Sequence, residues 1–306
     1  MGTGRTGTLQ RFLRVVAPRG RWQRLEVRDR LWDLTLSLPL IVFLIVFFVL
    51  PLVFVVVFAF GGYDATYRPT GRFHLQYFAD VWSPAIRTLF IRTAFVASVV
   101  TGLSFILSYP AAYYIAQLPR HRREFLVLLL VIPFWTSFLL RTYALRTLFD
   151  SDGLLNVMLQ AIGVSQGAVF ETGNLNSVIW AETYTFLPFM ALPLYANLEK
   201  LSRSMIEASY ILGAGRIRTF LRVILPLSVP GILAGSLLVF IIAMGELVIP
   251  FLVGGVEAQF LLGNAIYERA GQLPGQASAL GLLFFVVVLV ITYAYVRVVG
   301  RGGLQL

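Results

Sequence analysis

Long apolar stretches recur along this chain, and each is interrupted by only a few polar residues. A helix needs about 20 residues to cross the roughly 30 Å hydrocarbon layer of a bilayer. Six stretches are long enough, at residues 34–60, 89–118, 125–148, 175–198, 229–253 and 277–299. The pattern therefore predicts an all-α integral membrane protein with six transmembrane helices.

Arginine is concentrated in segments that a six-span arrangement places on one side of the membrane. Residues 1–33 hold eight arginines, and three more fill the short connection at 120–123. Residues 199–228 carry five further positive charges, and the C-terminal end carries two. Because Lys and Arg favour cytoplasmic segments, we expect both termini to be cytoplasmic. The predicted organisation is a basic arm at 1–33, a six-helix domain at 34–299 and a cytoplasmic tail at 300–306.

The composition agrees with this class and excludes much chemistry. Of 306 residues, 58% are hydrophobic and 13% are charged, and mean hydropathy is +0.79. Without cysteine, a disulfide, a thiol nucleophile or a thiolate zinc site is impossible. The single lysine, Lys200, lies outside any GxxxxGK[ST] phosphate loop, so the chain carries no Walker-type ATPase. The net charge of +10 is explained by topology and anionic lipid headgroups, and no nucleic-acid partner is expected.

The segment at 199–228 is the most patterned connection and will be called the 199–228 loop. Ser204 and Glu207 fit a capping box, which predicts a short helix beginning at Met205. Gly213 and Gly215 offer the positive φ that ends a helix. A second helix ending at Pro226 is expected to place Arg218 and Arg222 on one face. Its apolar face at helical spacing comprises Ile217, Phe220, Leu221 and Ile224.

Two interpretations of this loop are open on physical grounds. It could be a linker lying on the membrane surface, because amphipathic turns rest naturally among lipid headgroups. It could also be a stiff knuckle that docks on a partner, since Phe220 and Leu221 would otherwise face water or headgroups.

The same loop carries a resemblance to a known family. It reads Glu207-Ala208-Ser209-x3-Gly213-x9-Val223-x-Leu225-Pro226. This resembles the EAA loop, EAA-x3-G-x9-I-x-LP, of bacterial ABC-importer permeases, with Ser209 and Val223 as mild departures. Segments at 133–144, 187–196 and 245–255 are similar, in the same order, to spermidine/putrescine-type permeases, and the resemblance covers roughly residues 35 to 300.

The resemblance implies the type I importer architecture and a division of labour among subunits. This chain would be the permease subunit in the bacterial inner membrane and would form half of the pathway for a small organic cation, a polyamine above all. Its partners would be a second homologous permease, an ATPase dimer that binds ATP and Mg, and an extracytoplasmic solute-binding protein. This chain would hold no cofactor. The residues implied to couple it to the ATPase are Ser204, Glu207, Ala208, Gly213, Arg218, Phe220, Leu221, Arg222, Leu225 and Pro226.

Ionisable residues within the spans are candidates for the translocation path, because such residues usually face the bundle interior. Three fall toward the predicted outer side, namely Arg141, Glu182 and Glu246. The two carboxylates, with an aromatic face from Trp135, Trp180 or Tyr184, would suit an organic cation. Helical spacing places Trp180 and Tyr184 on one face and turns Glu182 away from it. Alternatively, Arg141 neutralises Glu182 or Glu246 in a buried pair that only holds helices together.

Other functions have less support in the residues. A permease of the same family for a different solute fits the same motifs. An ion-coupled secondary carrier usually shows inverted repeats with broken helices, and no convincing internal repeat occurs here. A membrane-embedded enzyme would need a catalytic constellation, and neither Cys, paired His nor a GxSxG motif is present.

Overall fold

The computed structural model describes residues 38–63, 69–73, 75–255 and 261–303. The predicted N-terminal arm at 1–33 and residues 304–306 of the predicted tail lie outside the described residues. The chain divides into two units, Met1–Val57 and Phe58–Leu306, each with its own internal contacts.

The first apolar stretch forms a helical span, Leu38–Phe60, of 23 residues. It contains a π-helical turn, η1 (Ile45–Val49), followed by α3 (Leu50–Phe60). The amide of Leu50 donates to the carbonyl of Ile45, five residues earlier. This wider turn directly precedes Pro51, whose missing N–H could not continue the ordinary ladder.

The start of the second unit departs from a purely helical fold. Strands β1 (Gly61–Tyr63) and β2 (Pro69–Phe73) pair antiparallel as a two-stranded ribbon. The short helix α4 (Gln76–Val81) follows, and its Val81 belongs to a small buried cluster. The other buried members of that cluster are Ala59, Ile86, Leu262, Ala279 and Leu280.

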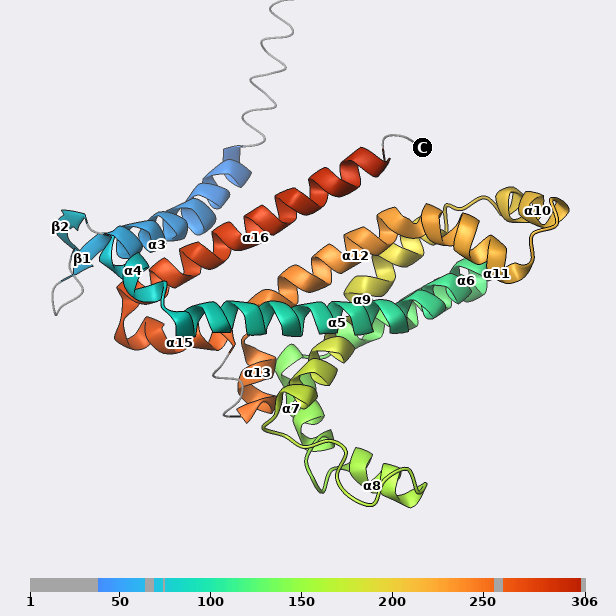
Figure 1. The fold of residues 1–306 in the computed structure, drawn as a ribbon, viewed down its shortest axis with the longest axis horizontal. Helices are drawn as coiled ribbons and strands as arrows, with labels where there is room; N and C mark the ends of the chain where they lie inside the picture. The colour runs from blue at the N-terminus through green and yellow to red at the C-terminus, as the bar shows by residue number, and fades with distance from the viewer. Residues whose placement is uncertain (1–37, 64–68, 74, 256–260, 304–306) are drawn as a thin grey trace, which may run out of the picture. The chain divides into compact units, whose positions relative to one another are not determined.

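Three long helices form the main core of the second unit, and they run side by side in Figure 1. They are α5 (Pro84–Gln117), α9 (Leu175–Leu198) and α12 (Leu225–Gly245). Gly231 lets α12 approach α9 closely, because an added Cβ would lie 2.6 Å from the Cβ of Asn197. The cluster between these helices contains Val96, Val100, Val178, Val239 and the unbranched Met190.

The third predicted span is broken. Its parts are α6 (Arg120–Val131), η2 (Ile132–Trp135) and α7 (Phe138–Leu148), and the two arms differ in direction by 90°. Pro133 cannot continue the backbone ladder, and Thr136 is extended with ψ of 147°. The predicted third span at 125–148 therefore consists of two helices joined at a corner.

The fifth span begins and ends earlier than predicted. The helix runs over Arg216–Gly245, and the chain breaks at Glu246 before a separate short helix, α13 (Val248–Val253). The remaining helices are α8 (Leu154–Ala161), α10 (Arg203–Ile211), α15 (Leu262–Gln272) and α16 (Pro274–Gly303). Among the described residues, four helices are long and apolar enough to cross a membrane, or five if the bent pair counts as one span. Helix α9 has 24 residues, many of them buried, and six spans remain a prediction.

Candidate functional site

The 199–228 loop begins with a helix whose start differs from the prediction. Helix α10 starts at Arg203 with Ser202 as its N-cap, and Ser202 makes no side-chain cap bond. Ser204 lies inside the first turn, and its hydroxyl pairs with the hydroxyl of Ser202. The capping role predicted for Ser204 was therefore wrong, because the helix starts two residues earlier.

The turn after α10 follows the predicted glycine geometry at one of the two glycines. Gly213 has φ of +82°, which confirms the left-handed position. Its amide donates to the carbonyl of Tyr210, and the amide of Ala214 donates to the carbonyl of Ser209, as in a Schellman cap. Gly215 instead has φ of −72° and is the N-cap of the next helix, so the expectation of positive φ fails there.

A buried hydroxyl pair ties the two arms of the loop together. The hydroxyls of Ser209 on α10 and Thr219 on α11 (Arg216–Thr219) lie 2.8 Å apart. Ser209 is 9% exposed and Thr219 is fully buried. Ser209 is also one of the two departures from the EAA pattern, so its hydroxyl has a structural partner that alanine would not provide.

The second arm of the loop is continuous with the fifth span. Helix α11 passes into the π turn η3 (Phe220–Ile224) and then into α12 without a break. The amide of Leu225 donates to the carbonyl of Phe220, five residues earlier. The prediction that Pro226 ends this helix was wrong, because the π turn adapts the ladder just before the proline.

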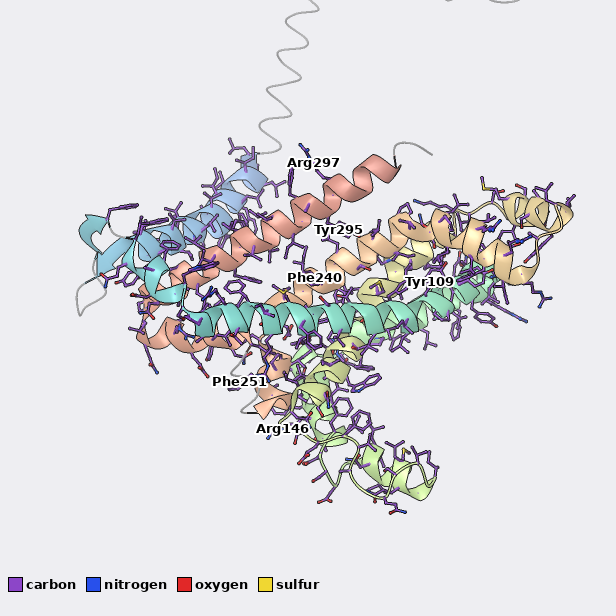
Figure 2. The ribbon with its side chains drawn as sticks, in the orientation of Figure 1. Tyr109, Arg146, Phe240, Phe251, Tyr295 and Arg297 are labelled. Atoms are coloured by element: carbon purple, nitrogen blue, oxygen red, sulfur yellow. The ribbon has the colours of Figure 1, made fainter. Side chains whose placement is uncertain are left out.

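The predicted apolar face of this arm is divided between two sides. Phe220 packs edge-on against Tyr109 and Tyr113 of α5, with ring centroids 5.7 and 6.1 Å apart; Figure 2 labels Tyr109 on α5. Ile224 is buried, whereas Ile217 and Leu221 are exposed. The wider π turn changes the angular spacing, so residues expected on one face separate. Phe220 therefore anchors the loop to α5 and does not form its outer surface.

The exposed apolar tip of the loop was not predicted. Ile211 and Leu212, directly before Gly213, are each 86% exposed. The sequence feature that could have predicted this tip is a pair of large apolar residues directly before a helix-ending glycine. Figure 1 shows α11 beside the C-terminal end of α5 and the start of α6, with α10 farther out. The other predicted coupling residues that lie exposed on the loop are Glu207, Ala208, Arg218, Arg222 and Pro226, while Leu225 is half-buried.

A cavity of about 560 Å³ lies where the loop meets α5. Its lining includes Tyr113 and Gln117 from α5 and Tyr210 from α10. A neighbouring ion pair joins Arg123 of α6 to Glu199, at 2.9 Å between Nη2 and Oε1. The loop thus rests on two helices of the second unit.

The two candidate path carboxylates occupy different environments. Glu246 lies at the break after α12, and its Oε1 accepts hydrogen bonds from the amides of Val248 and Ile249 at 2.9 and 3.1 Å. Glu182 lies in α9 and is 1% exposed, and its Oε2 has no hydrogen-bond partner among the described residues. Glu246 therefore positions the first residues of α13. In contrast, one buried carboxylate oxygen of Glu182, Oε2, accepts no hydrogen bond from the described residues.

Arg141 stabilises the corner between α6 and α7 in the broken span. Its Nη1 donates to the carbonyl of Pro133 at 2.9 Å, and its guanidinium lies about 6 Å from the rings of Phe134 and Phe138. Within the described part of the chain, neither Glu182 nor Glu246 forms an ion pair with Arg141. The buried pair considered from the sequence is therefore not the contact that Arg141 makes.

The aromatic candidates separate as helical spacing predicts. Trp180 and Tyr184 line one cavity of about 390 Å³ together with Arg141, whereas the buried Glu182 points elsewhere. Trp135 is 73% exposed and lies outside that cavity. A guanidinium in the wall makes the cavity a poor place for an organic cation. Across the described residues, no group of three or more His, Asp and Glu could hold a metal ion.

The family of the chain follows from a match over most of this region. The model of the family described as "binding-protein-dependent transport system inner membrane component" matches residues 108–302. The matched segment contains the broken span, the 199–228 loop and both candidate carboxylates. The chain belongs to this family. It is a permease subunit of the inner membrane and not an enzyme, so the resemblance drawn from the EAA-like pattern is confirmed.

Several relatives of known name share this family. The "spermidine/putrescine transport system permease protein PotB" of Escherichia coli strain K12 is 37% identical over 194 residues, covering 63% of this chain and 70% of PotB. PotB of Salmonella typhimurium strain LT2 is 38% identical over 194 residues, covering 63% and 67%. PotB of Haemophilus influenzae is 32% identical over 254 residues, covering 82% of this chain and 88% of its own length.

Solved structures show the same fold at lower identity. A bacterial ABC transporter involved in the import of the acidic polysaccharide alginate contains a chain that is 19% identical and has a TM-score of 0.68. The superposition covers 92% of this chain and 99% of that one. A second structure of the alginate transporter, in complex with an alginate pentasaccharide-bound periplasmic protein, gives a TM-score of 0.69 at 20% identity. The ABC-importer permease fold therefore extends over nearly the whole chain.

Proposed function

We propose that this permease forms half of the translocation pathway of an ATP-driven importer for a polyamine, of the spermidine or putrescine type. The observation that carries the proposal is the similarity to PotB of Haemophilus influenzae, at 32% identity over 88% of that protein. An alignment of this extent includes the path and not merely the loop. A small organic cation also suits the carboxylates present in and beside the spans.

We further propose that the complex contains a second homologous permease, two ATPase subunits and an extracytoplasmic solute-binding protein. ATP and Mg would bind to the ATPase subunits, and this chain would contribute the 199–228 loop as the contact that receives their movement. The exposed tip at Ile211 and Leu212 supports this role, because a docked protein would bury these two apolar side chains away from water. The arginine distribution supports six spans with both termini in the cytoplasm.

In the path we assign different roles to the two carboxylates. Glu182 would attract the cation, because a buried carboxylate oxygen without a partner is costly and has capacity for a ligand. Glu246 would hold α13 in place through its bonds to Val248 and Ile249. Arg141 would maintain the corner between α6 and α7.

The test is uptake into proteoliposomes that contain the whole complex, with radiolabelled spermidine, the cognate loaded binding protein and ATP inside. We expect ATP-dependent uptake that unlabelled putrescine or spermidine reduces, whereas an uncharged solute of similar length does not. Uptake without the ATPase subunits, or selective uptake of an anionic or neutral solute, would contradict the proposed function.

Paired substitutions separate the carboxylates. Glu182→Gln removes the carboxyl group that would pair with the cation and is expected to reduce spermidine uptake about tenfold or more, because the proposed contact with the cation is lost. Glu246→Gln keeps an oxygen that accepts from Val248 and Ile249, so uptake should fall less than threefold. If both variants import spermidine like the wild type at normal expression, neither carboxylate serves the path.

A further inference from the structure

A second cavity near the break after α12 has a different lining from the Arg141 cavity. It has a volume of about 320 Å³, within the lower range of ligand pockets, which is about 300–1,000 Å³. Its walls come from α7, α13 with the residue before it, and α15. The lining residues are Leu139, Tyr143, Leu247, Val248, Phe251, Leu252 and Tyr267.

Three separate helices each contribute one aromatic ring to this cavity. Tyr143 comes from α7, Phe251 from α13 and Tyr267 from α15 (Figure 2 labels Phe251). These side chains are 52%, 63% and 61% exposed, so their rings remain available to a ligand. Aromatic faces carry partial negative charge and attract organic cations within about 6 Å of the ring centre.

The electrostatic setting favours a cation here. Among the described residues, no Lys, Arg or His lines this cavity, whereas Arg141 lines the 390 Å³ cavity. The carboxylate of Glu246 bonds the amide of Val248, so a negative group lies directly beside the cavity wall. The described lining therefore offers three aromatic faces and no positively charged side chain.

The wall is also held in place before any ligand arrives. Glu246 fixes the first amides of α13, and the amide of Gly173 donates to the carbonyl of Val253 at 2.7 Å at its other end. Ile249 and Val253 on the opposite face are fully buried in the core. A fixed α13 keeps Phe251 turned toward the cavity, which lowers the ordering cost of binding.

We propose that Tyr143, Phe251 and Tyr267 form an aromatic site that holds an alkylammonium group of the substrate during its passage. This proposal rests on the proposed function, because it concerns the same organic cation. The three residues act as specificity determinants: they retain a cation after the binding protein releases it, and they offer little to an anion or a sugar.

The test measures how many spermidine molecules enter proteoliposomes per ATP hydrolysed by the whole complex at saturating loaded binding protein. Tyr143→Leu and Tyr267→Leu should each lower this ratio about fivefold, and together more than tenfold, because released substrate escapes outward. Tyr143→Phe and Tyr267→Phe keep the ring and should stay within about twofold of the wild type. A folding defect would instead lower uptake and hydrolysis together.

Matched controls make the result decisive. Tyr114 is 63% exposed on α5 and does not line the cavity, so Tyr114→Leu should leave the ratio unchanged. Phe251→Leu gives a third independent variant if one tyrosine variant fails to assemble. Unchanged ratios in the Leu variants, or equal losses in the Phe and Leu variants, would each overturn the aromatic site. Wild-type complex that imports no polyamine would instead overturn the proposed function.

Discussion

Two connecting segments of the second unit are held in place by opposite means. The 199–228 loop is shaped by backbone geometry, with a left-handed Gly213 at its turn and an exposed apolar tip. The segment at 149–174, which contains α8, is organised by one buried side chain. Figure 1 shows the two segments at separate places on the second unit.

The buried side chain is Asn156, which is completely inaccessible. Its amide nitrogen donates to the carbonyls of Asp150 and Phe170 at 2.8 and 2.7 Å, with Ser151 at 3.2 Å. Its oxygen accepts from the amides of Val169 and Phe170, both at 2.9 Å. One asparagine therefore satisfies backbone groups of two separate chain segments, at Asp150–Ser151 and at Val169–Phe170.

The two segments differ in the contacts that make them rigid. The 149–174 segment depends on a single residue whose loss leaves several buried polar groups unpaired. The 199–228 loop distributes its constraints among a glycine, a hydroxyl pair and the packing of Phe220. Loss of Asn156 should therefore unfold the 149–174 segment. Single substitutions in the 199–228 loop should each reduce transport only in part, with Gly213 as the exception.

The largest effect is expected at that glycine. Gly213→Asp should abolish ATP-driven uptake while leaving membrane insertion intact. A residue with a Cβ is strained at φ of +82°, by about 1–2 kcal/mol, and the new charge lies beside the exposed apolar tip. An added Cβ meets no atom within 4 Å, so the surrounding chain is not displaced. Uptake and ATP hydrolysis by the purified complex measure the outcome.

Gly215→Asp is the matched control for this change. It introduces the same charge two residues away, where φ is −72° and aspartate is a favoured N-cap. It should retain most of the uptake. Normal uptake by the Gly213 variant would refute the docking role of the loop, and equal loss in both variants would assign the effect to charge instead of geometry.

A smaller effect on transport, but a large one on local structure, is expected in the other segment. Asn156→Ala leaves two amides and up to three carbonyls without their partner, which should destabilise the segment by about 3 kcal/mol. Hydrogen exchange at Val169 and Phe170 should accelerate about 100-fold, while exchange in α9 stays slow. Gln160→Ala, at an exposed position of the same helix, should change neither. Retained protection in the Asn156 variant would show that the segment is held by other contacts.

The smallest effect should come from the hydroxyl pair of the loop. Ser209→Ala leaves the buried hydroxyl of Thr219 without this partner and should cost about 1 kcal/mol, measured from hydrogen exchange of α10. Adding Thr219→Val removes both hydroxyls and should recover most of that loss. A double variant that is additive, with no recovery, would exclude a direct link between the two arms.

Sequence reasoning succeeded where short-range geometry decides the outcome. The glycine at 213 had to permit positive φ, and helical spacing alone separated Trp180 and Tyr184 from Glu182. The family was identified from the spacing of Glu207, Gly213 and Pro226, since these positions are fixed along the chain. Each of these inferences needed no knowledge of distant contacts.

The features that sequence reasoning placed wrongly depend on local changes of the backbone, which the residue composition does not determine. Pro226 was expected to end a helix, but a π turn carries the helix through it. Glu246 was expected inside a span, but it lies at a break and its carboxylate accepts from the first amides of a separate helix. Asn156 was not singled out, because its five partners lie in segments that come together only in the folded chain. A lone asparagine among apolar helical residues was the only signal.

The uninterrupted run from Arg216 to Gly245 has a mechanical consequence. Thirty residues of helix make a rod about 45 Å long, and the arm that meets Ser209 is one end of it. We expect force applied to that arm to be transmitted along the helix. It travels as tilt or rotation to the far end, where the chain turns at Glu246 and presents α13. In the proposed function, the arm that receives the force and the wall of the aromatic site are thus successive parts of one polypeptide stretch.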